Sequence, residues 1–234
     1  LAFRVIARLD IKGPNVVKGV QMEGLRVVGK PAELARKYAE QGADEILYID
    51  TVASLYGRNH LEETLAQIDG IFVPISVGGG IRSISDARRL FNAGADKVVV
   101  NTAALERPDL INELADHFGS QAVIISIEAK RVNNHWECYS DCGRNPSSRD
   151  VTDWGRECAE RGAGEILLTS IDRDGTCSGP DVDLGLRLDI PIVVCGGIGI
   201  PEHATKAAEI ADAVAVGAAL HYGKTTIPAL KAAI

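Results

Sequence analysis

The sequence has few features of a metal-binding, nucleic-acid-binding or membrane protein. Its five cysteines are an odd number without paired Cys-x-x-Cys spacing, so they predict no metal site. They are instead typical of reduced thiols in a cytoplasmic protein. The net charge of −7 argues against a nucleic-acid-binding surface, because proteins that bind the phosphate backbone usually have a basic face. No apolar run approaches the roughly 20 residues of a membrane span. We therefore expect a cytoplasmic protein with no metal or cofactor, and with neither nucleic acid nor membrane as a partner.

Interdomain linkers are also lacking, because the chain has no Pro- or Ser-rich stretch, no low-complexity tract and no long charge run. Its 234 residues, 46% of them hydrophobic, could form one large α/β barrel or two small domains. The lack of a linker favours a single domain over residues 1–234.

What the sequence does contain is a repeat. Three pairs of segments recur about 118 residues apart, and such self-similarity decides the architecture. The pairs are VPISVGGGI (Val73–Ile81) with IPIVVCGGI (Ile190–Ile198), GADEIL (Gly42–Leu47) with GAGEIL (Gly162–Leu167), and LDIK (Leu9–Lys12) with IEAK (Ile127–Lys130).

Short apolar runs alternate with amphipathic segments of helix length, which is typical of βα units around a parallel sheet. Strands are predicted near Arg4–Asp10, Glu45–Asp50, Val73–Val77, Lys97–Asn101, Ala122–Ile127, Glu165–Ser170, Pro191–Cys195 and Asp212–Gly217. Helices are predicted over Pro31–Gln41, Asn59–Asp69, Ile84–Ala93, Arg107–His117, Asp150–Arg161, Asp181–Leu188 (short), Pro201–Glu209 and Thr225–Ala233.

Eight strands, eight helices and two similar halves predict a (βα)8 TIM barrel with an internal half-barrel duplication. Doubly wound sheets, the other α/β class, seldom show such a repeat. In a TIM barrel the chemistry lies at the C-terminal ends of the strands. The segment Arg131–Arg149 is too long and too rich in turn residues for a plain βα loop, so we expect a hairpin or lid there.

Two carboxylates occupy corresponding places in the repeat. Asp10 ends the first predicted strand and Glu128 the fifth, and these strands are diametrically opposite in an eight-stranded barrel. Facing carboxylates at the barrel mouth suit general acid and general base catalysis on a substrate between them. An acidic residue at a strand end can also be merely solvated, but the repeated pair favours a catalytic role.

Glycine runs in both halves predict phosphate sites. Gly78–Gly80 and Gly196–Gly197 each follow a strand and precede a helix, where backbone N–H groups can approach an anion. Asn101–Thr102, and in the other half Gly217–Ala218, complete two matching pockets. A lone glycine run could equally form a tight turn. Two runs at one offset favour a ligand with phosphate at both ends.

Other polar residues are candidates for binding. Thr169–Thr176, the predicted loop after the sixth strand, combines hydroxyls, carboxylates and a glycine. Lys18, in the long loop expected after the first strand, could contact an anion or be solvated.

A further group of charges lies at the opposite end of the predicted barrel. Arg4, Glu45, Lys97 and Glu165 each stand at the first position of a strand. The two-residue period of a strand turns Arg4 to the same side as Asp10. Two cations and two anions would make a neutral buried ring, and from spacing alone we favour a structural plug.

Together the motifs LDIK, NVVKG, VGGGIRS, DKVVVNTAA, FGSQAV, GAGEILLTSIDRDGT and GGIG resemble the cyclase subunit of imidazole glycerol phosphate synthase, from histidine biosynthesis. They stand in that family's order from Arg4 to the C-terminus. The sister barrel, an isomerase of the preceding step, shares the duplication. However, ILLTSIDRDGT and FGSQAV are more similar to the cyclase.

The resemblance implies a lyase/cyclase that forms a heterodimer with a glutaminase subunit. Ammonia from the glutaminase would pass through the barrel to a bis-phosphorylated ribulosyl-formimino aminoimidazole carboxamide nucleotide. Cyclisation and cleavage would then give imidazole glycerol phosphate and aminoimidazole carboxamide ribotide.

The resemblance also implies residue roles. Asp10 matches the first catalytic aspartate, and Glu128 occupies the place of the second. The ring of four charges matches an ammonia gate, which replaces the structural plug, and Asp96 lies beside it where the glutaminase would dock. The substrate and phosphate positions that match are Lys18, Gly80, Asn101, Thr102, Thr169, Asp174, Gly175 and Gly197.

Several residues depart from the family pattern. Glu128 is one methylene longer than the usual aspartate, and a misplacement of about 1 Å can cost roughly 10²-fold in rate. Arg8 replaces a small neutral residue and should point into the barrel with Asp10. There it would lower the pKa of either carboxylate or bind an anionic group of a different substrate. Cys195 and Ala218 replace serines, and the helix after the sixth strand is short.

Three hypotheses follow. The first is the ammonia-dependent cyclase. Arg8, Glu128 and the segment QMEGLR also resemble a side branch of cyclase-like proteins encoded with bacterial surface-sugar genes. The second hypothesis is therefore an ammonia-channelling subunit for amidation of a surface sugar. The third is a sugar-phosphate isomerase like the sister barrel.

Overall fold

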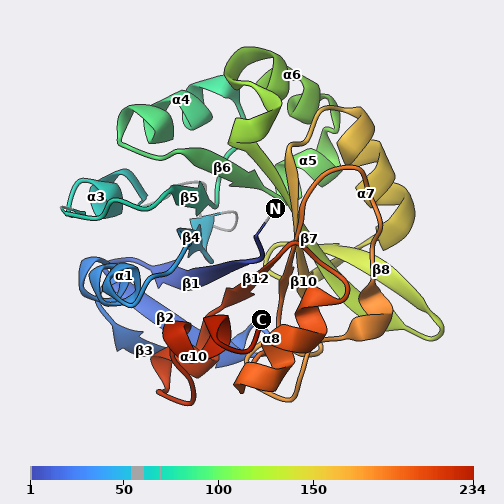
Figure 1. Cartoon of the computed structure of the whole chain (residues 1–234). Coiled ribbons are helices and arrows are strands. Elements are labelled where there is room, and N and C mark those ends of the chain that lie inside the picture. Colours follow the sequence, from blue (N-terminus) through green and yellow to red (C-terminus); the bar gives the residue numbers. More distant parts are fainter. Residues whose placement is uncertain (1, 54–60, 69) are drawn as a thin grey trace.

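The computed structural model describes residues 2–53, 61–68 and 70–234, and within these residues eight parallel strands close into a barrel (Figure 1). The closure is complete because β12 pairs with β1 and β10 pairs with β7. The strands are β1 (Arg4–Lys12), β4 (Glu45–Asp50), β5 (Ile75–Gly78), β6 (Lys97–Val100), β7 (Val123–Val132), β10 (Glu165–Ser170), β11 (Ile192–Cys195) and β12 (Ala213–Val216). The predicted TIM barrel is confirmed.

The repeat divides the barrel into two halves of four strands, β1, β4, β5 and β6 in the first and β7, β10, β11 and β12 in the second. Their registers correspond. Arg8 lies opposite Leu47 and Asp10 opposite Ile49, whereas Ser126 lies opposite Leu167 and Glu128 opposite Thr169. Asp10 and Glu128 are therefore equivalent positions, and Ser126 is the counterpart of Arg8.

Helices cover the outside of the barrel (Figure 1). They are α1 (Pro31–Glu40), α3 (Leu61–Leu65), α4 (Ile84–Asn92), α5 (Thr102–Glu106), α6 (Asp109–Phe118), α7 (Val151–Glu160), α8 (Pro201–Ala208), α9 (Ala218–His221) and α10 (Ile227–Lys231), with 3-10 turns η1 (Ser120–Ala122) and η2 (Val182–Leu184). The predicted proline starts of α1 and α8 are confirmed, since Pro31 and Pro201 stand in their first turns. None of the described helices is both long and apolar enough to cross a membrane.

Two predicted helices differ from the structure. The helix expected over Asn59–Asp69 lies partly outside the described residues, which show only α3. The short helix expected over Asp181–Leu188 is wrong, because only η2 forms there. Gly185 interrupts this segment, and glycine costs about 1 kcal/mol in a helix interior.

The core has two apolar layers. Side chains on the outer face of the strands pack against the helices. A second group fills the inside of the barrel and includes Ile6, Leu47, Val99, Ile124, Leu167 and Val193. This inner layer separates the charged residues at the two ends of the barrel.

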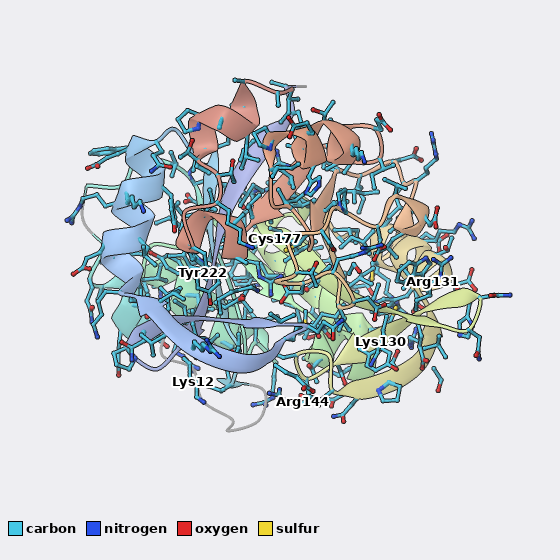
Figure 2. The ribbon with its side chains drawn as sticks, turned by 90° about the horizontal axis from the view of Figure 1, so that it is seen from below. Lys12, Lys130, Arg131, Arg144, Cys177 and Tyr222 are labelled. Atoms are coloured by element: carbon cyan, nitrogen blue, oxygen red, sulfur yellow. The ribbon has the colours of Figure 1, made fainter. Side chains whose placement is uncertain are left out.

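Both halves carry an antiparallel hairpin after their first strand. The hairpin expected at Arg131–Arg149 is confirmed as β8 (His135–Ser140) and β9 (Asn145–Asp150). The long loop expected after β1 is wrong, because β2 (Asn15–Val20) and β3 (Glu23–Gly29) form a second hairpin there. Figure 2 shows the two hairpins beside each other at one end of the barrel, near the labelled Lys12 and Arg144.

Candidate active site

The two repeated carboxylates are both buried at the barrel mouth, but their surroundings differ. Asp10 is 4% exposed, and both of its oxygens accept hydrogen bonds from cations. Oδ1 lies 2.9 Å from Nε of Arg8, and Oδ2 lies 2.8 Å from Nζ of Lys18. Burial alone would raise the pKa of Asp10, but the charges and hydrogen bonds of the two cations outweigh it and hold that pKa well below its usual value.

Lys18 joins this pair to a second carboxylate. It is buried in β2, and its Nζ also lies 2.9 Å from both oxygens of Asp174. Burial lowers the pKa of Lys18 and of Arg8, but the neighbouring carboxylates raise both above their usual values, so both stay charged. Lys18 therefore lies in a strand rather than in a loop and is buried rather than solvated, while its binding of a substrate anion stays a prediction.

Arg8 extends across the second half of the barrel. Its Nη1 lies 3.2 Å from Oγ1 of Thr169 and 3.3 Å from Sγ of Cys195. The space beside it has a volume of about 10 Å³, room for about one water molecule. This space is lined by the predicted phosphate residues Lys18, Asp174, Gly175, Gly197, Gly217 and Ala218. This space is far smaller than its counterpart in the first half, and phosphate binding at its residues stays a prediction.

Two of these glycines are required by packing alone. A Cβ on Gly197 would lie 2.0 Å from the carbonyl oxygen of Gly179, and one on Gly175 would lie 2.2 Å from that of Gly19. Both also have a positive φ. Their presence is explained without a ligand, so phosphate binding by them stays a prediction.

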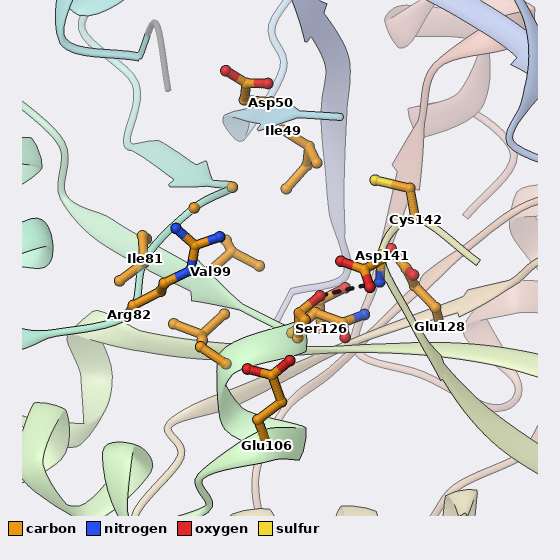
Figure 3. A pocket seen from close by; sticks show the side chains of 16 residues that line it. Ile49, Asp50, Ile81, Arg82, Val99, Glu106, Ser126, Glu128, Asp141 and Cys142 are labelled. Carbon is orange, nitrogen blue, oxygen red and sulfur yellow. Dashed lines mark hydrogen bonds between the residues drawn. The ribbon is translucent and has the colours of Figure 1, made fainter. Parts of the chain in front are cut away.

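The first half, in contrast, opens into a cavity of about 200 Å³ (Figure 3). Its walls include the predicted Gly80, Asn101, Thr102 and Glu128. Asn101 Nδ2 donates to the carbonyl oxygen of Tyr139 at 3.3 Å, while its buried Oδ1 has no hydrogen-bond partner among the described residues. Asn101 therefore presents an unused acceptor beside the cavity.

Other residues line this cavity that the sequence did not indicate, among them Arg82, Ser126, Asp141 and Cys142. Arg82 stands two residues after the glycine run in VGGGIRS, so that motif could have indicated it. The repeat could have indicated Ser126, because it occupies the position equivalent to Arg8. In Figure 3 the side chains of Arg82 and Glu128 lie on opposite sides of the cavity.

Glu128 is the only one of the two repeated carboxylates on the cavity wall. Its Oε2 accepts a hydrogen bond from the backbone N–H of Gly143 at 2.8 Å. Burial raises the pKa of Glu128 to about 7, against the opposing charge of Arg8 and the hydrogen bond from Gly143. A cation in the mouth was expected to lower the pKa of either carboxylate; the net result is a lowered pKa for Asp10 and a raised one for Glu128.

Each hairpin reaches over the opposite half of the barrel. In the turn between β8 and β9, the backbone N–H of Asp141 donates to Thr102 Oγ1 at 3.1 Å, and Cys142 Sγ donates to the carbonyl oxygen of Thr51 at 3.2 Å. In the other hairpin, Lys18 contacts Asp174, and the backbone N–H of Gln21 donates to the carbonyl oxygen of Asp174 at 2.8 Å. The turn between β8 and β9 thus covers the cavity of the first half.

The ring of four charges closes at the other end of the barrel. Arg4 contacts Glu45 at 3.4 Å and also pairs with Glu165. Lys97 Nζ lies 2.9 Å from Glu45 and 3.1 Å from Glu165. The ring is neutral, as the sequence predicted, with buried carboxylates and cations that are partly exposed.

Asp96 is exposed beside this ring, and its Oδ2 accepts a hydrogen bond from the backbone N–H of Ile75 at 2.8 Å. Asp212 receives an equivalent bond from Ile192 at 2.9 Å in the other half. The structure therefore gives Asp96 a bond to a strand end, while docking of a partner at this residue stays a prediction.

Comparisons with known proteins agree on one family. Residues 4–226 match the family described as "Histidine biosynthesis protein". The chain is 56% identical over 202 residues to "Imidazole glycerol phosphate synthase subunit HisF" of Legionella pneumophila, covering 84% of this chain and 95% of that relative. It is 46% identical over 239 aligned residues to the protein of the same name from Myxococcus xanthus (strain DK1622), covering 99% of this chain and 94% of that relative.

Proposed function

This chain belongs to the family of histidine biosynthesis proteins, and from that premise we propose that it is the cyclase subunit of an imidazole glycerol phosphate synthase. Both relatives carry this subunit name, which favours the first hypothesis over the sugar-amidation subunit and the isomerase. The enzyme is then a lyase that uses ammonia to cyclise and cleave the ribulosyl nucleotide. Its free thiols and the biosynthetic role of its relatives fit a cytoplasmic location.

The observation that carries the proposal is the cavity of about 200 Å³ with a buried, titratable carboxyl on its wall. The positive-φ glycines Gly79 and Gly80 and the unused acceptor of Asn101 lie on the same wall. One phosphate of the substrate would bind between the glycine turn and Thr102. The reacting part of the nucleotide would then lie toward Glu128, within reach of proton transfer.

The second phosphate would bind in the other half, near Gly197, Gly217 and Ala218. Because that space holds only about one water, its side chains must move to admit a phosphate. Arg8 and Lys18 are the cations that would meet the anion there. Arg8 would make a charge-assisted bond to phosphate through Nη1, which contacts Thr169 and Cys195, while its Nε keeps the bond to Asp10.

The subunit names of the relatives imply a complex, and we propose a glutaminase as the partner in a heterodimer. It would dock at the ring of Arg4, Glu45, Lys97 and Glu165, with Asp96 at its edge. Beyond the ring, the interior is apolar up to the mouth. Neutral ammonia can cross such a layer, whereas ammonium would lose its hydration without a counter-charge.

The first experiment is a steady-state assay of the purified chain with the ribulosyl nucleotide and an ammonium salt. We expect release of imidazole glycerol phosphate and the aminoimidazole carboxamide ribotide. No turnover at saturating ammonia, with Glu128→Asp restoring none, would overturn the cyclase function. Turnover of the aminoimidazole precursor without ammonia would indicate an isomerase instead.

The second experiment tests the ring with the cognate glutaminase present. Arg4→Met should impair the glutamine-dependent reaction at least tenfold while the ammonium-dependent reaction stays within twofold of the parent, because the substitution lies far from the mouth. Arg156→Met, an exposed arginine on α7, is the matched control. Equal loss of both activities would contradict a gate.

A further inference from the structure

We propose that Arg8 is a positioning residue that fixes Asp10 as a permanent anion, so that Glu128 is the one mouth carboxyl that exchanges protons with the bound ligand. The substrate in this inference rests on the proposed function, but the division of roles between the carboxyls does not. It assigns different tasks to two residues that the repeat makes equivalent.

Both oxygens of Asp10 accept hydrogen bonds from cations, so protonation of either oxygen would cost an ion pair. One oxygen is held by Arg8 and the other by Lys18, and all three residues are at most 5% exposed. Charge-assisted hydrogen bonds are roughly twice as strong as neutral ones, so protonation of Asp10 would weaken its bonds to both cations at a high cost in free energy. Asp10 also does not line the cavity of about 200 Å³.

Glu128 has the opposite environment. It lies on the cavity wall, and its only hydrogen bond from the described residues comes from the backbone N–H of Gly143. That bond fixes the carboxyl in place without neutralising it. Oε1 accepts no hydrogen bond from any described residue, so it is available to a ligand, and burial brings the pKa of the group to about 7.

The cause of the difference is one position in the repeat. Arg8 and Ser126 occupy equivalent places two residues before the carboxylates. Arg8 binds Asp10, whereas the short side chain of Ser126 cannot neutralise Glu128 and leaves space for the cavity that it lines. Arg8 therefore locks the aspartate together with Lys18, while Ser126 leaves the glutamate without a cation in contact.

In the reaction, ammonia would add to the carbonyl carbon of the ribulosyl group, whose oxygen leaves as water, and its nitrogen would bond to the formimino carbon to close the ring. During ring closure the carboxylate of Glu128 would accept a proton from this ammonia-derived nitrogen, becoming a neutral acid. It would return the same proton to the nitrogen of the departing ribotide as the bond to that nitrogen breaks. Glu128 thus ends in its starting state, and no other reactant is needed. Asp10, Arg8 and Lys18 keep their charges throughout.

The deciding experiment needs no turnover. Carboxyl ¹³C NMR of protein labelled in Asp and Glu, with signals assigned from Asp10→Asn and Glu128→Gln, reports each titration directly. We expect the Glu128 signal to titrate near pH 7 and the Asp10 signal to stay that of a carboxylate down to about pH 4. Arg8→Met should raise the titration midpoint of Asp10 by about 1–3 pH units, as expected when a neighbouring arginine is removed. Arg131→Met, which removes a mouth cation without contact to Asp10, should not.

Arg8→Lys serves if the methionine variant does not fold, because it keeps the charge but changes the bond to Asp10. The Asp10 midpoint should then move by less than 1 unit. An Asp10 signal that titrates between pH 4 and 8 in the parent protein would overturn the inference. So would a Glu128 signal that stays that of a carboxylate down to pH 5.

Kinetics provide the second readout, with total ammonium adjusted at each pH to keep free ammonia constant. In the parent protein kcat/KM should rise with pH through an ionisation near pH 7. Glu128→Gln should lower kcat/KM about 10³-fold and abolish that ionisation, within the range for loss of a general acid–base group. Asp10→Asn should retain it. Loss of the ionisation in Asp10→Asn alone would overturn the inference, whereas an inactive parent with the expected NMR titrations would overturn only the proposed function.

Discussion

The two halves of the barrel have corresponding strands, registers and hairpins, yet their mouths differ. The first half opens into about 200 Å³, and the second leaves about 10 Å³ around Arg8. Ser126 of β7, a neutral residue two positions before Glu128, lines the larger space. Its counterpart Arg8 of β1 extends toward Thr169 and Cys195 of the second half and borders the smaller space. A duplicated backbone can thus keep its geometry while one side chain decides which half holds a cavity.

The difference also concerns charge. Arg8, Asp10, Lys18 and Asp174 form a buried neutral cluster, whereas Glu128 has no cation in hydrogen-bond contact among the described residues. Buried pairs contribute little net stability as a unit, but removal of one partner leaves an uncompensated charge. Replacement by the neutral amide should therefore destabilise the fold strongly at Asp10 and only slightly at Glu128.

The largest expected effect is the difference in stability between variants that neutralise Asp10 or Glu128. Asp10→Asn should lower the free energy of unfolding by about 3–5 kcal/mol at pH 7, because two buried cations then share only Asp174. Glu128→Gln should cost less than about 1 kcal/mol, since it removes no ion pair. Urea unfolding of both variants measures this contrast. Equal losses would show that the two carboxylates are equivalent.

The next effect depends on pH. The folded-state pKa of Glu128, about 7, lies above its ordinary value of 4.5, so its contribution to stability is present below pH 4.5 and is lost as pH rises through 7. Relative to the parent, Glu128→Gln should therefore gain about 2–3 kcal/mol in unfolding free energy between pH 4.5 and 8.5. Asp10 contributes the opposite way: its lowered pKa gives stability above its ordinary value of 3.8 that is lost only on stronger acidification. Unfolding curves across this range test both, and a pH-independent difference for Glu128→Gln would contradict its raised pKa.

The smallest expected effect concerns phosphate itself. Inorganic phosphate should bind in the first half, and Thr102→Ala should weaken it about tenfold through loss of one hydroxyl near a charged ligand. Ala218→Ser adds a hydroxyl at the matching place in the second half and should change the affinity less than twofold. Isothermal titration calorimetry gives both values. Two equivalent sites per chain would show that both halves accept phosphate without a larger ligand.

The sequence predicted most of the barrel because its strands are short apolar runs. The predicted bounds of the strands Glu45–Asp50 and Glu165–Ser170 agree with the structure to the residue. Helices α5 and α9 were missed because five and four residues are too few for a helical period to show. The hairpin after β1 was missed because polar residues interrupt its apolar pattern.

The site was harder to predict, because its contacts join distant residues. The two-residue period indicated correctly that Arg8 points inward. It could not show that Arg8 would bind Asp10 rather than leave an anion site, since that choice depends on Thr169 and Cys195, far along the chain. The unequal cavities follow from this side-chain packing, which a repeat of the backbone does not determine.

The hairpins have one more consequence. Each arises in one half of the barrel and covers the other, so Asp141 and Cys142 of the second half form part of the wall of the cavity in the first. Two separate half-barrels with the same contacts would be a dimer whose subunits had exchanged arms, a low-cost route to association. When the two halves are joined in one chain, each hairpin still covers the other half, but the sequence of each half can change independently. The hairpin β2–β3 now places Lys18 in the half with the small space, whereas the hairpin β8–β9 covers the half with the large cavity.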